Sequence, residues 1–210
     1  MQIQWYGEGC FKLSSGDITI MTDPTDKDSG LNTPRFKSDI VLHTSTPAIS
    51  ATEDFGQIQD GETHIIHGPG EYEIKEVQIK GWPLKKDSQT DRLRGIFRVR
   101  FDDLSLGFLD SLSNFKEPEI LEELGDIDIL FIPGGGDPYL STEEAAKLVR
   151  QVDPRIVIPT HFKVKGLKRK ASEVKDFLKE LGLEDTKPQE KVSLKRKDLT
   201  EKLQAIVLTI

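Results

Sequence analysis

Three short runs of consecutive apolar residues constrain the fold more than any other feature of this sequence. They cover residues 40–42, 129–132 and 156–159, and the last two belong to strands predicted at 127–132 and 155–159. Runs of this kind are typical of strands that are buried on both faces, inside a sheet covered by other layers. The first run leads into a polar, hydroxyl-rich loop at residues 43–50. Because α/β proteins place their chemistry beyond the carboxyl ends of strands, we expect a site near this loop.

The first half of the chain is predicted to be mostly β. Strand patterns separated by turn residues occur at residues 1–6, 10–13, 17–21, 38–43, 63–67, 73–80, 96–101 and 104–109. The second and third form a hairpin, as do the last two, and residues 25–34 and 82–94 are predicted as polar loops.

The second half alternates helices with the buried strands. Helices are predicted at residues 117–124, 141–152 and 171–181, and a final β pair at 189–195 and 205–210. Ser141 and Glu144 have the spacing of a capping box, and Gly182 is placed to end the third helix. Strands followed by strand–helix units predict one α/β (α+β) domain spanning residues 1–210.

Composition excludes several classes of function. The chain has 29 Lys and Arg against 36 Asp and Glu, a net charge of −7, which argues against a nucleic-acid partner. Cys10 is the only cysteine, so neither an internal disulfide nor a cysteine zinc site can form, and we expect a small buried hydrophobe. No apolar segment approaches the roughly 20 residues of a membrane span, and the N-terminus lacks a signal-peptide pattern. We therefore expect a cytoplasmic protein without membrane contact.

Two smaller patterns concern the neighbourhood of the expected site. The run Gly134-Gly135-Gly136 lacks the ending of a phosphate loop and is predicted to let two backbones approach closely. His64 and His67 are three residues apart, so an extended chain directs them to opposite faces. We expect His67 to cap the end of its strand.

Five motifs occur in order along nearly the whole chain. They are GEGCF at residues 7–11, DP at 23–24, GPGEYE at 68–73, FIPGG at 131–135 and IPTHF at 158–162. Together they resemble the metallo-β-lactamase superfamily, in particular its small branch of zinc-dependent hydrolases related to ascorbate-6-phosphate lactonase. The resemblance implies a four-layer αββα sandwich with a dinuclear metal site along one sheet edge.

The resemblance also implies that the metal motif is degenerate. The family's His-x-His-x-Asp-His signature falls on Ser45, Pro47, Ile49 and Ser50, none of which is a good transition-metal ligand. His43 stands two positions too early. The ligands that the resemblance leaves are Asp110, which normally bridges two metals, and His161. Glu8 stands where the family has an early histidine, and Asp23 is a possible neighbour.

Two functions follow, and whether the chain is an enzyme stays open. The favoured hypothesis is a hydrolase homologue that has lost its zinc motif, binds no cofactor and acts as a binding module for a small molecule or protein. Asp110 and His161 would then form a hydrogen-bonded couple. The alternative is a hydrolase of esters, lactones or phosphodiesters, with zinc or manganese in a rebuilt site of Glu8, Asp23, Asp110 and His161. A metal-free reaction with His161 as general base ranks last, because the sequence offers no companion nucleophile.

Overall fold

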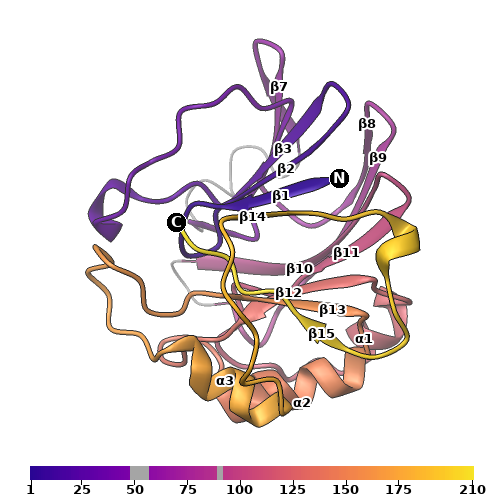
Figure 1. Ribbon diagram of the computed structural model, residues 1–210. Helices are drawn as coiled ribbons and strands as arrows, with labels where there is room; N and C mark the ends of the chain where they lie inside the picture. The colour runs from indigo at the N-terminus through magenta and orange to yellow at the C-terminus, as the bar shows by residue number, and fades with distance from the viewer. Residues whose placement is uncertain (48–56, 89–91) are drawn as a thin grey trace.

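The computed structural model describes residues 1–47, 57–88 and 92–210. Two mixed β-sheets pack face to face, and three α-helices lie outside the second sheet, along the lower side of Figure 1. This arrangement agrees with the predicted sandwich of two sheets and flanking helices.

The first sheet contains seven strands among the described residues, in the order β14-β1-β2-β3-β4-β7-β6. Their bounds are β1 Gln2–Trp5, β2 Phe11–Ser15, β3 Ile18–Thr22, β4 Ile40–Leu42, β6 Gln57–Asp60, β7 Thr63–Ile66 and β14 Lys191–Ser193. β4 is parallel to both of its neighbours, β3 and β7, so these three strands end at the same edge of the sheet.

The second sheet contains eight strands among the described residues. Seven follow the order β15-β13-β12-β11-β10-β9-β8, and the eighth, β5, pairs with β10. Their bounds are β5 Ser45–Pro47, β8 Glu71–Ile74, β9 Val77–Pro83, β10 Arg92–Phe101, β11 Leu104–Phe108, β12 Ile129–Pro133, β13 Ile156–Thr160 and β15 Gln204–Ala205. β11, β12 and β13 are parallel, so their carboxyl ends also share one edge.

Local sequence signals explain where the helices begin and end. The helices are α1 Glu119–Leu124, α2 Thr142–Val152 and α3 Val174–Leu181, with short 3-10 turns η1 Lys27–Ser29 and η2 Arg196–Asp198. The predicted capping box of Ser141 and Glu144 starts α2. Gly182, with a φ of 69°, ends α3 as predicted. α3 begins three residues later than predicted.

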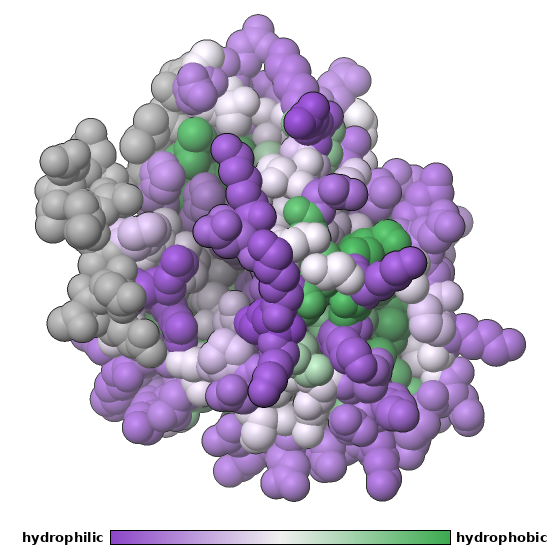
Figure 2. Space-filling model, turned by 90° about the vertical axis from the view of Figure 1, so that its left-hand side faces the viewer, coloured by the Kyte–Doolittle hydropathy of each residue, from purple (hydrophilic) through white to green (hydrophobic). Residues whose placement is uncertain are grey.

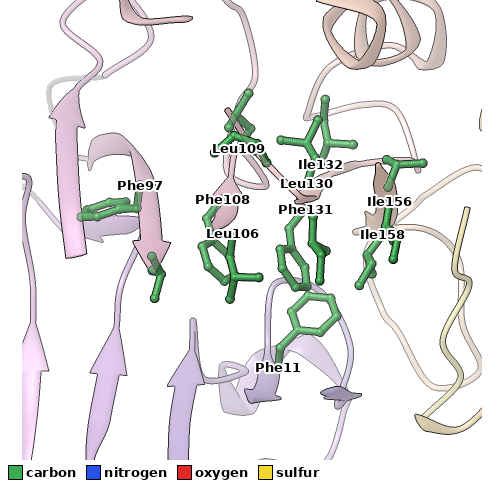
Figure 3. Close-up of a cluster of buried hydrophobic side chains, with 14 of the residues drawn as sticks. Phe11, Phe97, Leu106, Phe108, Leu109, Leu130, Phe131, Ile132, Ile156 and Ile158 are labelled. Carbon is green, nitrogen blue, oxygen red and sulfur yellow. The ribbon is translucent and has the colours of Figure 1, made fainter. Parts of the chain in front are cut away.

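The core lies between the two sheets. Phe11 of β2 meets Phe131 of β12 edge-on at 4.8 Å, and Phe131 stacks on Phe108 of β11 at 4.5 Å (Figure 3). Each ring is fully buried, and burying one such side chain contributes about 1.5–3 kcal/mol. Cys10 is buried beside this core, as predicted.

Four predictions of secondary structure are wrong. Residues 73–80 form no single strand, because Lys75 and Glu76 both adopt positive φ and turn the chain from β8 into β9. The predicted terminal β pair does not form as such: β14 joins β1, β15 joins β13, and only Gln189 bridges to Leu208. The predicted loop at 82–94 contains the end of β9 and the start of β10. The polar loop after residue 43 contains β5.

Candidate functional site

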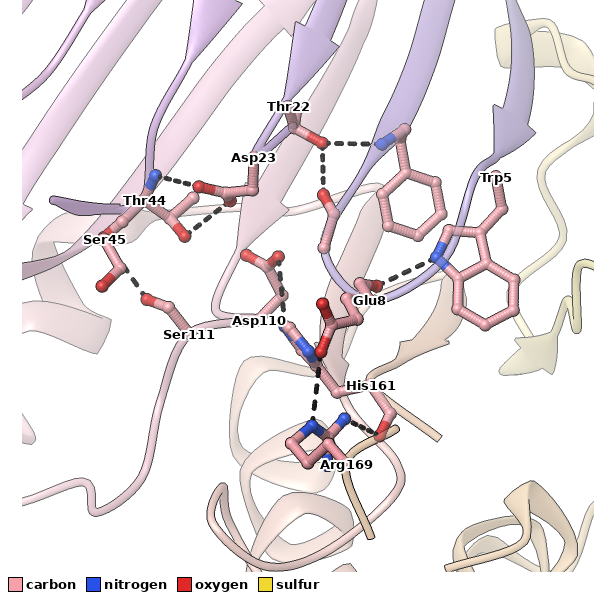
Figure 4. A network of polar contacts seen from close by, with 12 residues as sticks. Trp5, Glu8, Thr22, Asp23, Thr44, Ser45, Asp110, Ser111, His161 and Arg169 are labelled. Carbon is pink, nitrogen blue, oxygen red and sulfur yellow. Dashed lines mark hydrogen bonds and ion pairs between the residues drawn. The ribbon is translucent and has the colours of Figure 1, made fainter. Parts of the chain in front are cut away.

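The parallel strands of both sheets deliver polar side chains to one edge of the sandwich (Figure 4). Asp23 directly follows β3, Thr44 follows β4 by two residues, Asp110 follows β11 and His161 follows β13. Ligand sites of α/β folds occur beyond the carboxyl ends of strands. The edge encloses a pocket of about 450 Å³, lined in part by Glu8, Asp23 and His161.

Asp23 is held in place by the strand beside it. Its carboxylate accepts hydrogen bonds from the amide of Thr44 at 2.8 Å and from the Thr44 hydroxyl at 2.7 Å. Burial raises the pKa of Asp23 to about 7, although the Thr44 bonds and the charge of Arg92 lower it. The carboxylate is therefore oriented but costly to ionise.

Asp110 is a buried carboxylate of the site whose oxygens lack described hydrogen-bond partners. It is 1% exposed, and neither of its carboxylate oxygens has a hydrogen-bond partner among the described residues. Burial, followed by the charge of Asp23, raises the pKa of Asp110 well above its usual value, against smaller lowering effects of its own amide and of the nearby Thr44 hydroxyl, neither of which has the geometry of a hydrogen bond to it. A Cβ atom at Gly9 would collide with Asp110 and touch Asp23, so both carboxylates stand close to that glycine. Buried polar atoms without partners are rare, and each needs an explanation such as a bound water, an ion or a catalytic role.

His161 lies beside Asp110 without bonding to it. Its Nε2 is 3.9 Å from Oδ2 of Asp110, which is too long for a hydrogen bond, so the predicted hydrogen-bonded couple does not form. Burial, and then the charges of Arg169 and Arg94, lower the pKa of His161 to about 3, and its Nδ1 has no described partner. The imidazole is thus neutral at physiological pH and offers a lone pair.

The backbone of His161 is fixed by contacts on both sides. A Cβ at Gly135 would collide with the carbonyl of His161, which confirms the predicted close approach of two backbones. The same carbonyl accepts a bond from Arg169 at 2.8 Å. The ring of Tyr139 stacks on the imidazole at 4.0 Å, and the guanidinium of Arg169 lies over Tyr139 at 5.2 Å.

Glu8 reaches the pocket from the turn between β1 and β2. Its carboxylate pairs with Nε of Arg169 at 3.3 Å, as Figure 4 shows. Three of the four predicted ligands, Glu8, Asp23 and His161, have positive φ values of 50°, 31° and 56°. Non-glycine residues adopt this region rarely and at a cost, and such residues cluster at functional sites.

The structure describes two of the four positions to which the resemblance assigns the zinc motif. Ser45 and Pro47 belong to β5, which pairs with β10 so that Ser45 faces Arg94 and Pro47 faces Arg92. Ile49 and Ser50 lie outside the described residues. His43 lines the pocket and stacks in parallel on His67 at 5.1 Å. Burial, then the charge of His67, lowers the pKa of His43 to about 4.

Four residues of the site were not predicted: Arg92, Arg94, Tyr139 and Arg169. The two arginines fall in the segment that was predicted as a charged loop. Their spacing of two residues, directly before the strand pattern at 96–101, was the available signal, because it directs both side chains to one face of an extended strand. Tyr139 and Arg169 lie in loops and have no periodic pattern that would mark them.

The donor types of the site suit a divalent cation. Across the residues that the structure describes, no three His, Cys, Asp or Glu side chains already surround a common point at metal-binding distance. Two ligands of one tetrahedral zinc ion lie about 3.4 Å apart, so Asp110 and His161 would need to approach by about half an ångström. Carboxylate oxygens with one neutral imidazole are ligands for divalent metals.

Two stacked mixed sheets, flanking helices and a polar site at the strand ends define the fold class of the metallo-β-lactamases. Residues 2–161 match the family model described as the β-lactamase superfamily domain. The chain belongs to this superfamily.

Several similar proteins carry names that refer to metals. A UPF0173 metal-dependent hydrolase from Listeria monocytogenes is 24% identical over 194 residues, covering 77% of this chain and 85% of the relative. A UPF0173 protein from Pyrococcus abyssi is 26% identical, covering 79% and 85%. A crystal structure from Thermotoga maritima, described as a candidate zinc-dependent hydrolase of the superfamily, covers both chains completely at 26% identity and a TM-score of 0.79. Among the described helices, none is long and apolar enough to cross a membrane.

Proposed function

We propose that this protein is a metal-dependent hydrolase with a rebuilt site, in which Asp110, His161 and Asp23 hold one divalent cation. The observation that carries the proposal is the carboxylate of Asp110, which is buried with both oxygens unpartnered. An ionised carboxylate in such a position costs several kcal/mol unless a cation compensates it. The names of the relatives support the same conclusion.

The residues fit such an ion by chemistry. Asp110 offers two free oxygens, and the neutral imidazole of His161 offers a lone pair 3.9 Å away. Asp23 retains acceptor capacity beside its bonds from Thr44. Glu8 forms an ion pair with Arg169 and is therefore not counted among the proposed metal ligands.

The chain's own residues set up the remaining chemistry. A divalent cation supplies Lewis-acid polarisation of a carbonyl or phosphoryl oxygen and a nucleophile at neutral pH. Thr44 orients Asp23, and Tyr139 with Arg169 fixes the ring and carbonyl of His161. The pocket admits a small ester, lactone or phosphodiester to the same edge. Manganese and zinc are the candidate metals.

A second candidate is a binding module without metal. The feature that favours it is β5, which places Ser45 and Pro47 in strand pairing at positions where the superfamily has histidine ligands. Serine hydroxyls are poor transition-metal ligands and proline has no side-chain donor. In this case the pocket would bind its ligand with Asp110 protonated.

Metal content and affinity separate the two candidates. The protein is purified without chelator, its metal is measured by mass spectrometry, and Mn²⁺ and Zn²⁺ are titrated into the chelated chain by calorimetry. We expect one ion per chain, and hydrolysis of generic phosphodiester or lactone substrates by the loaded protein. Asp110→Ala should weaken metal binding at least a hundredfold.

Asp17→Asn is the matched control, because Asp17 is an exposed aspartate in the turn between β2 and β3. It should bind metal like the wild type. Absence of saturable binding by the wild-type chain up to millimolar Mn²⁺ and Zn²⁺ would overturn the metal-dependent hydrolase and leave the binding module as the candidate.

A further inference from the structure

The pairing of β5 with β10 brings two arginines to the wall of the pocket. In this antiparallel pair Arg94 stands opposite Ser45 and Arg92 opposite Pro47. Side chains that face each other across such a pair, and those two residues along, share one face. All four residues line the pocket that holds Asp23 and His161. Guanidinium groups therefore stand beside the positions where the superfamily has its first metal ligands.

The charges of both arginines act on the site. Burial dominates the pKa shifts of Asp23 and His161, but the charge of Arg92 contributes at Asp23 and that of Arg94 at His161. Figure 2 looks onto the side of the molecule that is at the left in Figure 1, and polar residues dominate that face.

The arginines of the site differ in how their charge is compensated. Arg94 pairs with the buried Asp87 at 3.3 Å, and Arg169 pairs with Glu8. Arg92 has no ion pair with any carboxylate that the structure describes, and its guanidinium donates a hydrogen bond of 3.2 Å to the hydroxyl of Ser45. It is an exposed guanidinium at the pocket wall with most of its donors free.

Two further donors accompany Arg92. The hydroxyl of Ser45 accepts from Arg92 and so keeps its own hydrogen for a ligand. Nε of Arg94 is buried and has no described partner. Donors on two neighbouring strands that line one pocket suit an acceptor with oxygens in several directions. Phosphate is tetrahedral and meets this need, whereas a planar carboxylate engages a single guanidinium fork.

We propose that Arg92, Ser45 and Nε of Arg94 form a phosphate-binding subsite, which holds the phosphate group of a small phosphorylated substrate next to Asp110 and His161. As a statement about substrate, this inference rests on the proposed hydrolytic function. As a statement about binding, it is independent of metal.

The test measures phosphate binding by the chelated, metal-free full chain, by calorimetry at constant ionic strength. We expect saturable binding of inorganic phosphate, and weakening of at least tenfold in Arg92→Gln. Arg92→Lys should fall between the two, because an ammonium keeps the charge but loses the bidentate fork. Arg92 is exposed, so its variants should fold; circular dichroism and the melting temperature verify this.

Arg100→Gln is the matched control. Arg100 is an exposed arginine on the same strand, but it lines a different pocket with Asp102 and Asp103. Its variant should bind phosphate within twofold of the wild type. Equal losses in both variants, unchanged binding in Arg92→Gln, or no saturable binding by the wild type would overturn the subsite.

Two more ligands define its chemistry. Glycerol 3-phosphate should bind at least as tightly as inorganic phosphate, and its exclusion would contradict a substrate subsite. Acetate should bind at least tenfold more weakly, and equal affinity would contradict selection for phosphate. Phosphate binding without metal binding contradicts the proposed hydrolase alone, whereas metal binding without phosphate binding contradicts the subsite alone.

Discussion

Two buried aspartates at opposite ends of the second sheet differ in how their charge is accommodated. Asp128 stands immediately before β12, and its carboxylate accepts bonds from the amide of Ser105 at 2.8 Å and from Arg196 at 2.7 Å. Its backbone also bonds to Ser105, Arg155 and Ile156, so it joins the starts of three strands. Asp110, at the carboxyl end of β11, has two carboxylate oxygens without a described partner.

The difference separates a structural carboxylate from a functional one. At the amino ends of the strands the fold supplies an amide and a guanidinium to the buried carboxylate of Asp128. At the carboxyl ends it supplies burial, a second carboxylate and a neutral imidazole, but few donors. A buried acid that is left unsatisfied beside a pocket lowers stability, and it is expected to persist only where a ligand completes it. Four experiments test this contrast.

Removing the structural carboxylate should have the largest effect. Asp128→Ala deletes the acceptor of the Ser105 amide and of Arg196, and bonds to charged groups contribute about 1.5–3 kcal/mol. We expect the free energy of unfolding to fall by about 3 kcal/mol in urea denaturation. Asp126→Ala, an exposed aspartate two residues earlier, should change it by less than about 0.5 kcal/mol. Similar effects of the two substitutions would mean that the hydrogen bonds of the Asp128 carboxylate do not stabilise the fold.

Metal should stabilise the protein through the functional carboxylate. A ligand of the native state at 100 times its dissociation constant adds about 2.7 kcal/mol to the free energy of unfolding. We expect a gain of this size with saturating Mn²⁺ or Zn²⁺, measured by thermal unfolding and reversed by chelator. Asp110→Asn should abolish it, and Asp128→Asn should retain it. A gain that survives in Asp110→Asn would place the cation elsewhere.

Much of this fold was accessible from the sequence because its signals are local. The apolar runs mark β4, β12 and β13, and a capping box and a glycine delimit α2 and α3. The errors arose where pairing is non-local. Residues 189–195 and 205–210 each look like strands, yet their partners, β1 and β13, lie far away in the chain. Local propensity does not identify such partners.

The site was predictable only in part, for a similar reason. The motifs around Asp23, Asp110 and His161 placed all three near one edge, where the structure has them. Arg92 and Arg94 were missed because a charged stretch resembles a loop until its partner strand is known. The stacking of Tyr139 on His161, with Arg169 over Tyr139, depends on loop paths that no periodicity in the sequence indicates. The proposed metal and phosphate sites therefore depend on tertiary contacts.

The dependence of stability on acid pH tests whether His43, which directly follows β4, is buried in its neutral form. His43 has a pKa of about 4 because of burial and the neighbouring His67, against about 6.5 in an unfolded chain. The unfolded state therefore binds more protons between these values, so the stability that His43 contributes is complete above pH 6.5 and is lost as the pH falls toward 4. Because other buried groups titrate in both chains, the test is the difference between them: from pH 7 to pH 5 we expect the wild type to lose about 2 kcal/mol more than His43→Gln. Parallel curves for both chains would contradict a buried neutral His43.

The smallest effect should be that of Asp110→Asn on the metal-free protein, and its sign carries the information. The amide has nearly the same shape as the carboxyl group but cannot ionise, so it removes the cost of a buried charge that lacks partners. In the presence of chelator at pH 8 we expect the free energy of unfolding to stay equal or rise by about 1 kcal/mol. Asp128→Asn should lower it under the same conditions, because an amide cannot serve Ser105 and Arg196 as a carboxylate does. A loss of stability in both variants would mean that Asp110 is as well satisfied as Asp128, and that the fold, rather than a cation, requires its charge.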